Sequence, residues 1–232
     1  MISWACSDLH GHLKAYDKIK KFINPDDVVF CLGDCGDRGP DPWETIKTVA
    51  KDEQFIYLKG NHEDMLVKAA REVFNFEFNP YCEKQRILAS NGGMETLDQL
   101  LGEEKPEQWV NYLNKLPTHI TYINKKEQEI FLSHAGCTFW KDDEFTLPSE
   151  KDMLWDRLHF YDNAKLLGKP IVVHGHTSKW RIASELGILV PTGALEYADG
   201  KKYCIDAATY RKGSIILLNL DSLESFEFSI ND

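Results

Sequence analysis

The first 60 residues alternate three short apolar runs with two segments of helical periodicity, and this order leaves few folds open to the chain. The apolar runs cover residues 2–7, 27–32 and 54–58. Residues 13–23 repeat apolar side chains at helical spacing, and residues 42–50 begin with a proline, which is favoured at the start of a helix. A strand–helix–strand–helix–strand order predicts a parallel sheet joined by right-handed crossovers.

The rest of the chain is first helical in pattern and then returns to strands. Residues 62–116 are more polar and helical, and we interpret them as a helical excursion within one domain that covers residues 1–232. Later strand patterns lie at residues 118–123, 128–133, 170–173, 187–190, 202–206 and 213–219. Turn-forming residues between them favour antiparallel pairing. Together these elements predict an α/β (α+β) fold, a β-sandwich of two mixed sheets flanked by helices.

Five short polar motifs follow apolar, β-branched runs, so each is expected at the end of a strand. They are Asp8-Leu9-His10-Gly11, Gly33-Asp34-Cys35-Gly36-Asp37-Arg38-Gly39, Gly60-Asn61-His62-Glu63, His134-Ala135-Gly136 and Gly175-His176-Thr177. Five strand ends that converge on one edge of a sheet can hold two metal ions. A pair of metal ions activates water against a phosphate ester. The motifs therefore favour a metal-dependent phosphoesterase, with the helical excursion lying beside its site.

The side chains in these motifs suit a pair of divalent ions. Asp8 and His10 alternate with Leu9, so we expect their side chains to share one side of an extended segment. Asp34 can bridge two ions if the first two strands are neighbours. The expected ligand set is Asp8, His10, Asp34, Asn61, His134 and His176. Nitrogen and oxygen ligands without a thiolate suit Mn, Fe, Zn or Ni, and we expect Mn first.

Each ligand candidate has a simpler interpretation when it is considered alone. An Asp after a strand is more often a helix cap or turn residue, and a single His is more often structural. The five motifs in this order outweigh those interpretations.

Hydrolysis of a phosphate ester also needs positive charge and a proton donor. Arg38 lies in a glycine-flanked loop, and Arg157 is a second candidate for binding the phosphate oxygens, with a surface salt bridge as its simpler role. His62 is the candidate donor of a proton to the leaving alkoxide. A carboxylate beside His62 would orient the ring and raise its pKa, and Asp37 is the expected partner, with Glu63 as the competitor.

Composition limits the partners and the compartment that we expect. The net charge of −10 argues against an extended nucleic-acid partner, and it hints at a basic protein or peptide as substrate. The sequence shows no secretory signal and no apolar run long enough to cross a membrane, so we expect a cytoplasmic protein without a membrane partner. Cys6, Cys31 and Cys204 are expected as small core residues, and Cys35 as a packing residue beside the site with a redox role as the alternative.

The motifs resemble those of the PPP-type serine/threonine protein phosphatases, in the compact bacterial and phage branch of the calcineurin-like metallophosphoesterases. That family's pattern is GDxHG, GDxxDRG and GNHE, then a late strand that carries His, then a GH motif. The resemblance spans residues 7–218, and its most specific parts are residues 33–39 and 60–63. It implies the calcineurin-like β-sandwich with a helical insertion. Residues 87–93, which end in Asn-Gly-Gly, resemble a segment that phage and bacterial members carry.

The resemblance also implies roles for individual residues. The first ion would be bound by Asp8, His10 and Asp34, and the second by Asp34, Asn61, His134 and His176. Arg38 and Arg157 would contact the phosphate, and the His62–Asp37 pair would protonate the leaving group. No counterpart of the eukaryotic tail that docks regulatory subunits is present, so we expect no such subunits.

Three positions depart from the family's pattern. Ser7 stands where Gly is usual before the first Asp, and we expect little consequence. Cys35-Gly36 stands where bulkier residues are common, which predicts a looser loop around Arg38. His174 precedes the Gly175-His176 pair. Alignment on the family's Gly-His motif favours His176 as the ligand, and His174 is then expected to have a structural role or to support the ligands from behind.

The favoured function is hydrolysis of phosphomonoesters, with phosphoserine or phosphothreonine in proteins as the first candidate and phosphotyrosine as a further one. The partner would be a phosphoprotein or phosphopeptide. A symmetric dinucleoside tetraphosphate hydrolase is the first alternative, although Glu63 and Asp37 favour the ester reaction. A catalytically silent scaffold that binds phosphoproteins is the second alternative.

Overall fold

The first of two mixed sheets carries the amino-terminal alternation of strands and helices. The computed structural model describes residues 1–74, 83–136, 140–141, 144–145, 147–161 and 170–231. The order of the first sheet is β12-β11-β1-β2-β3, with β1–β2 and β2–β3 parallel and β11 antiparallel to both of its neighbours. Its strands are β1 (Ser3–Cys6), β2 (Val28–Cys31), β3 (Phe55–Tyr57), β11 (Ser214–Asn219) and β12 (Ser225–Ser229). The predicted parallel β1–β2–β3 core is confirmed.

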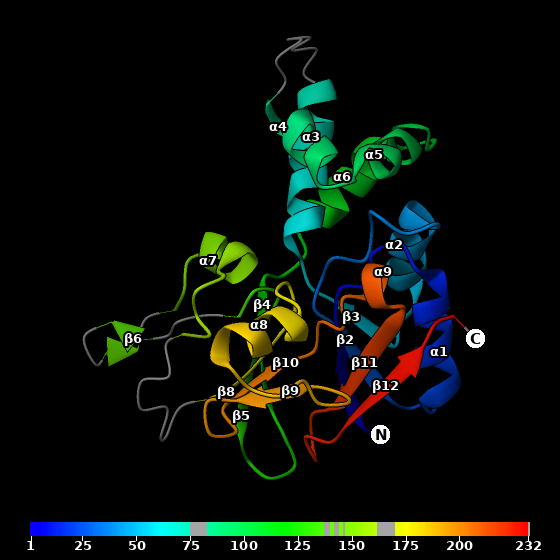
Figure 1. Ribbon diagram of the computed structural model, residues 1–232. Coiled ribbons are helices and arrows are strands. Elements are labelled where there is room, and N and C mark those ends of the chain that lie inside the picture. Colours follow the sequence, from blue (N-terminus) through cyan, green and yellow to red (C-terminus); the bar gives the residue numbers. More distant parts are fainter. Residues whose placement is uncertain (75–82, 137–139, 142–143, 146, 162–169, 232) are drawn as a thin grey trace.

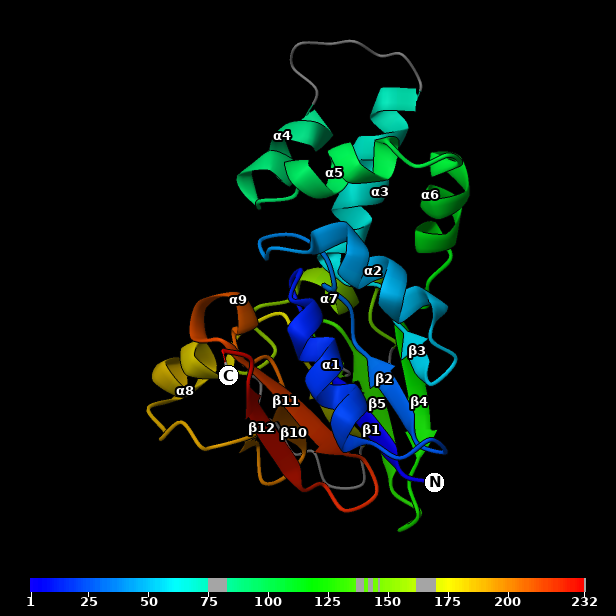
Figure 2. The same ribbon diagram turned by 90° about the vertical axis from the view of Figure 1, so that its right-hand side faces the viewer.

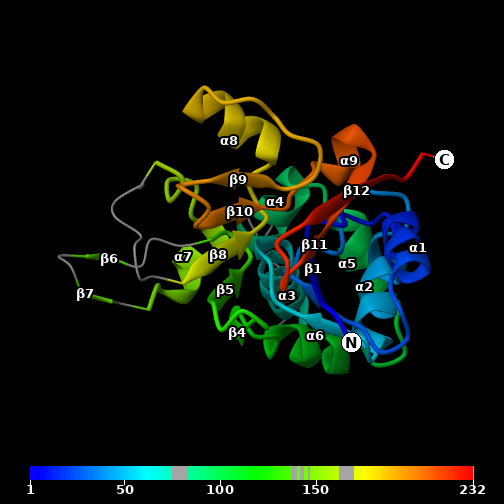
Figure 3. The ribbon, with the colours of Figure 1, turned by 90° about the horizontal axis from the view of Figure 1, so that it is seen from below.

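The second sheet packs against the first, as the sequence predicted. Its order is β4-β5-β8-β10-β9. The strands are β4 (His119–Ile123), β5 (Glu129–Ser133), β8 (Ile171–His174), β9 (Leu195–Tyr197) and β10 (Lys202–Cys204), and a separate short pair is formed by β6 (Trp140–Lys141) and β7 (Glu144–Phe145). Figures 2 and 3 show the two sheets as adjacent layers.

Strand β2 shows why both faces of the first sheet are apolar. Val29 and Cys31 pack under the helices, whereas Phe30 and the following Leu32 point between the sheets. A period of two along a strand produces this division, and burial on both faces explains the nearly continuous apolar run. The layer between the sheets is completed by residues such as Leu132 of β5.

Helices cover the outer face of the first sheet and extend beyond one end of it. Helices α1 (Leu13–Phe22) and α2 (Pro42–Lys51) lie on that outer face (Figure 2). Between β3 and β4 the described residues form four helices that stand at one end of the sheets (Figure 1). They are α3 (Asn61–Phe74), α4 (Glu83–Ser90), α5 (Met94–Leu101) and α6 (Pro106–Asn114). The helical pattern predicted over residues 62–116 is therefore confirmed in its described part, and residues 75–82 lie outside the described residues.

Three further helices follow among the residues that the structure describes in the second half of the chain. They are α7 (Glu150–Trp155), α8 (Lys179–Leu186) and α9 (Thr209–Lys212). Ile182 and Ala183 of α8 pack with Leu195 and Tyr197 of β9. Within the described ranges, no helix combines the length and apolarity that crossing a membrane requires.

Two predictions about the later strands were wrong. Residues 187–190 form no strand: Gly187 ends α8 at a φ of 66°, and Leu189 is 92% exposed. An apolar run becomes a strand only where a neighbouring strand accepts its backbone hydrogen bonds, and here the partner strand is β9 instead. Antiparallel pairing was also only partly correct, because β8 is parallel to both β5 and β10.

Candidate active site

Parallel strands β1, β2 and β3 end at one edge of the first sheet, and the loops that follow them are joined by backbone hydrogen bonds. The backbone N–H groups of Asp8 and His10 donate to Gly33 and Asp34 carbonyls at 3.1 and 2.9 Å. Helix α3 begins at Asn61 immediately after β3, and the His62 N–H donates to Asp34 Oδ1 at 2.9 Å. The prediction that these motifs lie next to one another is therefore confirmed.

Two loops of the second sheet bring histidines to the same place. His134 follows β5, and its Nδ1 donates to the Leu32 carbonyl of the first sheet at 2.8 Å. His176 follows β8, and its backbone N–H donates to Asp8 Oδ2 at 3.0 Å. A Cβ at Gly175 would lie 2.1 Å from Asp8 Oδ2, so this close approach of the two loops requires glycine.

Several site residues occupy the left-handed region of backbone conformation, which residues other than glycine adopt at a cost. The φ angles are 56° for Asp8, 45° for His10, 56° for Asp34 and 62° for His176. The prediction that Asp8 and His10 lie on one extended segment was therefore wrong. Their side chains converge because the chain turns at both residues.

Four of the six predicted ligands, together with His62, meet in two groups that share Asp34. Donor atoms of His10, Asp34 and His62 lie within 4.8 Å of one another, and so do those of Asp34, His134 and His176. The other two predicted ligands join these groups. His10 Nε2 lies 3.7 Å from Asp8 Oδ1, and Asn61 Oδ1 lies 2.9 Å from His134 Nε2 and 2.8 Å from His176 Nδ1.

The donor set fits a pair of divalent ions. All six residues are buried, and His176 Nε2 has no hydrogen-bond partner among the described residues. Imidazole, carboxylate and amide donors are the mixture that Mn, Fe, Zn and Ni accept. Burial also holds the pKa of His10 and of His176 well below the usual range, which favours the neutral imidazole that ligates a metal.

The electrostatics of the buried carboxylates call for positive charge at the site. Burial raises the pKa of Asp8 well above its usual range, and the nearby charge of Asp206 adds to this. Burial acts in the same direction on Asp34, but the histidines around it, His134 first, hold its pKa well below the usual range. Burial alone would lower the pKa of His134, whereas the charge of Asp34 raises it to about 10.

His62 pairs with Asp37, and not with Glu63. His62 Nδ1 lies 2.5 Å from Asp37 Oδ2, and Thr96 of α5 also donates its hydroxyl to Asp37. Glu63 instead accepts hydrogen bonds from the backbone N–H groups of Asp34, Cys35 and Gly60 and from the Tyr57 hydroxyl, at 2.6–2.9 Å. Glu63 is therefore a buried residue whose hydrogen bonds hold the loop after β2 in place.

The Asn-Gly-Gly segment supports the same loop from the helical side. Arg38 donates Nε–H to the Asn91 carbonyl at 3.3 Å, and its backbone N–H donates to the Gly92 carbonyl at 3.4 Å. A Cβ at Gly93 would lie 2.7 Å from Asp37 Oδ2. These contacts contradict the expectation of a loose loop around Arg38.

The positions beside the motifs have defined packing roles. Ser7 was expected to matter little, but its hydroxyl donates to Asp8 Oδ2 at 2.5 Å and so orients that carboxylate. His174 Nε2 contacts the Tyr197 hydroxyl at 2.7 Å, consistent with a structural role. Cys35 is buried with its Sγ 3.3 Å from Cys31 Sγ. Cys6, Cys31 and Cys204 are buried core residues, as predicted.

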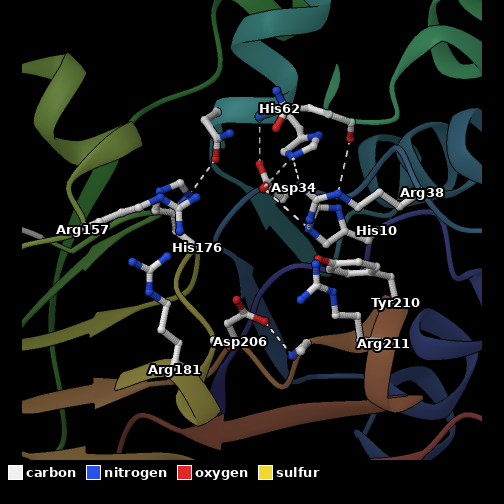
Figure 4. Close-up of a pocket in the computed structure, with 14 residues that line it drawn as sticks. His10, Asp34, Arg38, His62, Arg157, His176, Arg181, Asp206, Tyr210 and Arg211 are labelled. Carbon is white, nitrogen blue, oxygen red and sulfur yellow. Dashed lines mark hydrogen bonds and ion pairs between the residues drawn. The ribbon is translucent and has the colours of Figure 1, made fainter. Parts of the chain in front are cut away.

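A pocket of about 260 Å³ opens over these ligand groups (Figure 4). The sequence did not predict the residues that line the pocket opposite the ligand groups. Arg38 and Arg157 both line it, as predicted, and Arg157 contacts Thr177 Oγ1 at 3.4 Å. The residues that sequence reasoning missed are Asn91, Ser178, Arg181, Asp206, Ala208, Tyr210 and Arg211. Asn91 belongs to the Asn-Gly-Gly segment that the sequence resemblance included, whereas the others follow β8 and β10 without any recognisable motif.

Residues 1–186 match the family model of the calcineurin-like phosphoesterases. The chain belongs to that family. The resemblance drawn from the five motifs is thus confirmed at the family level, together with the predicted sandwich fold. This family uses a dinuclear site for divalent metals, and the two ligand groups around Asp34 are the phosphoesterase's candidates for it.

Solved structures with the same fold carry several activities. A provisionally assigned diadenosine tetraphosphatase is 14% identical, with a TM-score of 0.59 and coverage of 97% of this chain and 92% of that one. A serine/threonine phosphatase from Saccharomyces cerevisiae with similarity to human phosphatase PP5 is 15% identical, with a TM-score of 0.60 and coverage of 98% and 79%.

A cold-active protein-tyrosine phosphatase of a Shewanella species is 20% identical, with a TM-score of 0.61 and coverage of 99% and 78%. At such identities the likeness shows the fold and leaves the substrate open. A comparison with curated protein sequences finds no match.

Proposed function

We propose that the phosphoesterase hydrolyses phosphomonoesters of proteins, phosphoserine and phosphothreonine first and phosphotyrosine as a further substrate. The observation that carries this proposal is the 2.5 Å contact between His62 Nδ1 and Asp37 Oδ2 beside the ligand groups. A serine or threonine alkoxide is a poor leaving group and needs an oriented proton donor. An anhydride releases a stabilised anion and makes little use of such a pair.

Each polar side chain of the pocket has a role in this proposal. Arg38 and Arg157 bind the phosphate oxygens, because planar guanidinium groups pair with phosphate in two parallel hydrogen bonds. Asp37 accepts from Nδ1 of His62, and Nε2 of His62, which lies 2.8 Å from Nη2 of Arg38, would protonate the leaving oxygen once Arg38 turns to the bound phosphate. A bound pair of divalent ions would supply Lewis acidity and an activated water.

The ions would be held by the side chains that converge on Asp34. We propose Asp8, His10 and Asp34 for one ion, and Asp34, Asn61, His134 and His176 for the other. Manganese is our first proposal for the metal, with Fe, Zn or Ni as alternatives that suit the same donors. The partner we propose is a phosphoprotein or phosphopeptide, with no nucleic acid, membrane or regulatory subunit required.

A dinucleoside tetraphosphate hydrolase is the second candidate, because the pocket carries arginines beyond the two that a single phosphate needs. The test compares kcat/KM for phosphoserine and phosphothreonine peptides with kcat/KM for diadenosine tetraphosphate in one Mn²⁺ buffer. We expect the peptides to be preferred. A preference of roughly 100-fold for the dinucleotide, about 2.7 kcal/mol in the transition state, would replace the proposal with this candidate.

A catalytically silent scaffold is distinguished by the same assay. Retention of the ligands, Arg38, Arg157 and His62 speaks against a silent protein. Metal-dependent turnover of any of these substrates would exclude the scaffold function.

A further inference from the structure

The pocket holds two arginines for which the proposed chemistry has no use. Arg181 comes from α8 and Arg211 from α9, and both guanidinium groups point toward the pocket on the side opposite His62 (Figure 4). With Arg38 and Arg157 they make four arginines around one opening, in a chain whose net charge is −10. Four guanidinium groups thus gather at one opening on an acidic protein.

These two arginines are not neutralised by acidic neighbours. Among the residues that the structure describes, no carboxylate lies within 4.0 Å of the guanidinium nitrogens of Arg181 or Arg211. Asp206, which also lines the pocket, is buried and accepts a hydrogen bond from the Ala208 N–H at 2.7 Å. Burial, and next to it the charge of Arg181, lowers the pKa of Arg157, as expected where like charges face each other.

Tyr210 separates Arg211 from the arginine at the catalytic side. The Tyr210 ring centre lies 4.6 Å from the Arg38 guanidinium and 5.1 Å from that of Arg211. Arg211 is therefore held beside the ring by a cation–π contact, at a position next to Arg38 and distinct from it. Ser178, at the start of α8, adds a hydroxyl to the lining near Arg181.

Unpaired guanidinium groups that converge on an opening favour an anionic ligand, because each offers a fork of donors to phosphate or carboxylate. We propose that Arg181 and Arg211 form a second anion subsite, which binds a phosphate or carboxylate carried by the substrate next to the scissile phosphate. This inference rests on the proposed function. The substrate class is then a phosphopeptide with a second phosphorylated or acidic residue beside the phosphoserine. The subsite selects among substrates and takes no part in the bond cleavage.

The test measures peptide binding separately from peptide turnover. Peptides of one sequence carry a non-hydrolysable phosphonate analogue of phosphoserine, followed by phosphoserine, Asp or Ala. Each peptide competes with p-nitrophenyl phosphate for the full chain loaded with Mn²⁺, and its Ki is measured. We expect the Ki for the phosphoserine neighbour to be at least tenfold lower than for the Ala neighbour, a difference of about 1.4 kcal/mol. The Asp peptide shows whether a carboxylate suffices.

The arginine variants decide whether the two residues cause this preference. Arg181→Gln and Arg211→Gln should each reduce the Ki ratio, and the double variant should bring it close to one. Arg86→Gln changes an exposed arginine of α4 outside the pocket and should keep the wild-type ratio. A wild-type ratio near one, or a double variant that keeps the wild-type ratio, would overturn the subsite.

Failure of the proposed function gives a different result. In that case hydrolysable phosphopeptides are not turned over, whereas the Ki ratios still report the second subsite. If only diadenosine tetraphosphate binding depends on Arg181 and Arg211, and the peptides show no preference, the peptide form of the proposal is wrong.

Discussion

The two sides of the pocket are built in opposite ways. The motif side consists of buried residues on tight loops after parallel strands, such as Asp34 and His62, and buried hydrogen bonds hold each of them. The arginine side consists of exposed side chains on α8 and α9, Arg181 and Arg211. Bond cleavage needs donors held in one geometry, whereas selection of a charged substrate tolerates mobile side chains. We therefore expect the residues of the motif side to set the rate of hydrolysis and those of the arginine side to set the preference among substrates.

The largest effect is expected from Asp34, which both ligand groups share. Asp34→Asn removes the charge at that shared position, so we expect metal content to fall and activity to drop by several orders of magnitude. Metal analysis and kcat on an aryl phosphate measure both effects. Asp17→Asn, on the exposed surface of α1, is the matched control. Full activity in protein shown to be free of metal would contradict the proposed role of the motif side.

A smaller loss is expected when the proton donor is removed. His62→Asn should slow hydrolysis of alkyl phosphates by about 10²–10⁴-fold, the usual contribution of general acid catalysis. The loss should be much smaller for aryl phosphates with acidic phenols, because they need less protonation. His119→Asn on β4 is the control, since His119 lies outside the pocket.

The donor atoms of His62 also lie close to those of His10 and Asp34, so metal content gives a second test. Normal metal content in His62→Asn supports a proton donor. A fall in metal content with equal losses for alkyl and aryl phosphates would make His62 a ligand.

Glu63, which holds the loop after β2 on the motif side, should affect the stability of the protein as well as the rate of hydrolysis. Glu63→Gln replaces a carboxylate that accepts three backbone hydrogen bonds and one from Tyr57, so we expect a loss of about 2–4 kcal/mol in the free energy of unfolding. Urea denaturation measures it. Arg181→Gln should change that free energy by less than about 0.5 kcal/mol. Equal losses in the two variants would remove the contrast between the sides.

The smallest effect concerns salt. Exposed charges are screened within about 10 Å at 0.1 M ionic strength and within about 3 Å at 1 M, whereas buried donors are screened much less. Raising NaCl should therefore shrink the Ki preference for the doubly charged peptide severalfold and leave metal content unchanged. Competition assays and metal analysis over a salt series measure this. A preference that does not respond to salt would place the second anion on buried groups instead.

Most of the motif side could be predicted from the sequence because its geometry follows from local rules. Parallel strands end at one edge, so residues after β1, β2 and β3 had to lie close together, and Asp8, Asp34 and Asn61 do. The local conformation could not be predicted in the same way. Asp8 and His10 turn through left-handed φ angles that hydrogen bonds to the loop after β2 stabilise.

The predictions that failed depended on long-range contacts. Residues 187–190 have the apolar character of a strand, but β9 takes the place beside β10. Pairing directions in the second sheet depend on which strands meet, as the parallel β5–β8–β10 order shows. Such choices are decided by burial and hydrogen bonding across the sheet, which a short window of sequence does not contain.

The sequence by itself determined the family, the parallel core of the first sheet and the residues that we propose to hold metal and to donate a proton. Those features are encoded in periodicity and in short motifs, because the residues involved are neighbours in the sequence or follow directly after neighbouring strands. Only the tertiary structure decided that Arg181 and Arg211 share a pocket with Arg38 and Arg157. An exposed arginine on a helix has no local signature, and its function depends on which distant charges the fold places beside it.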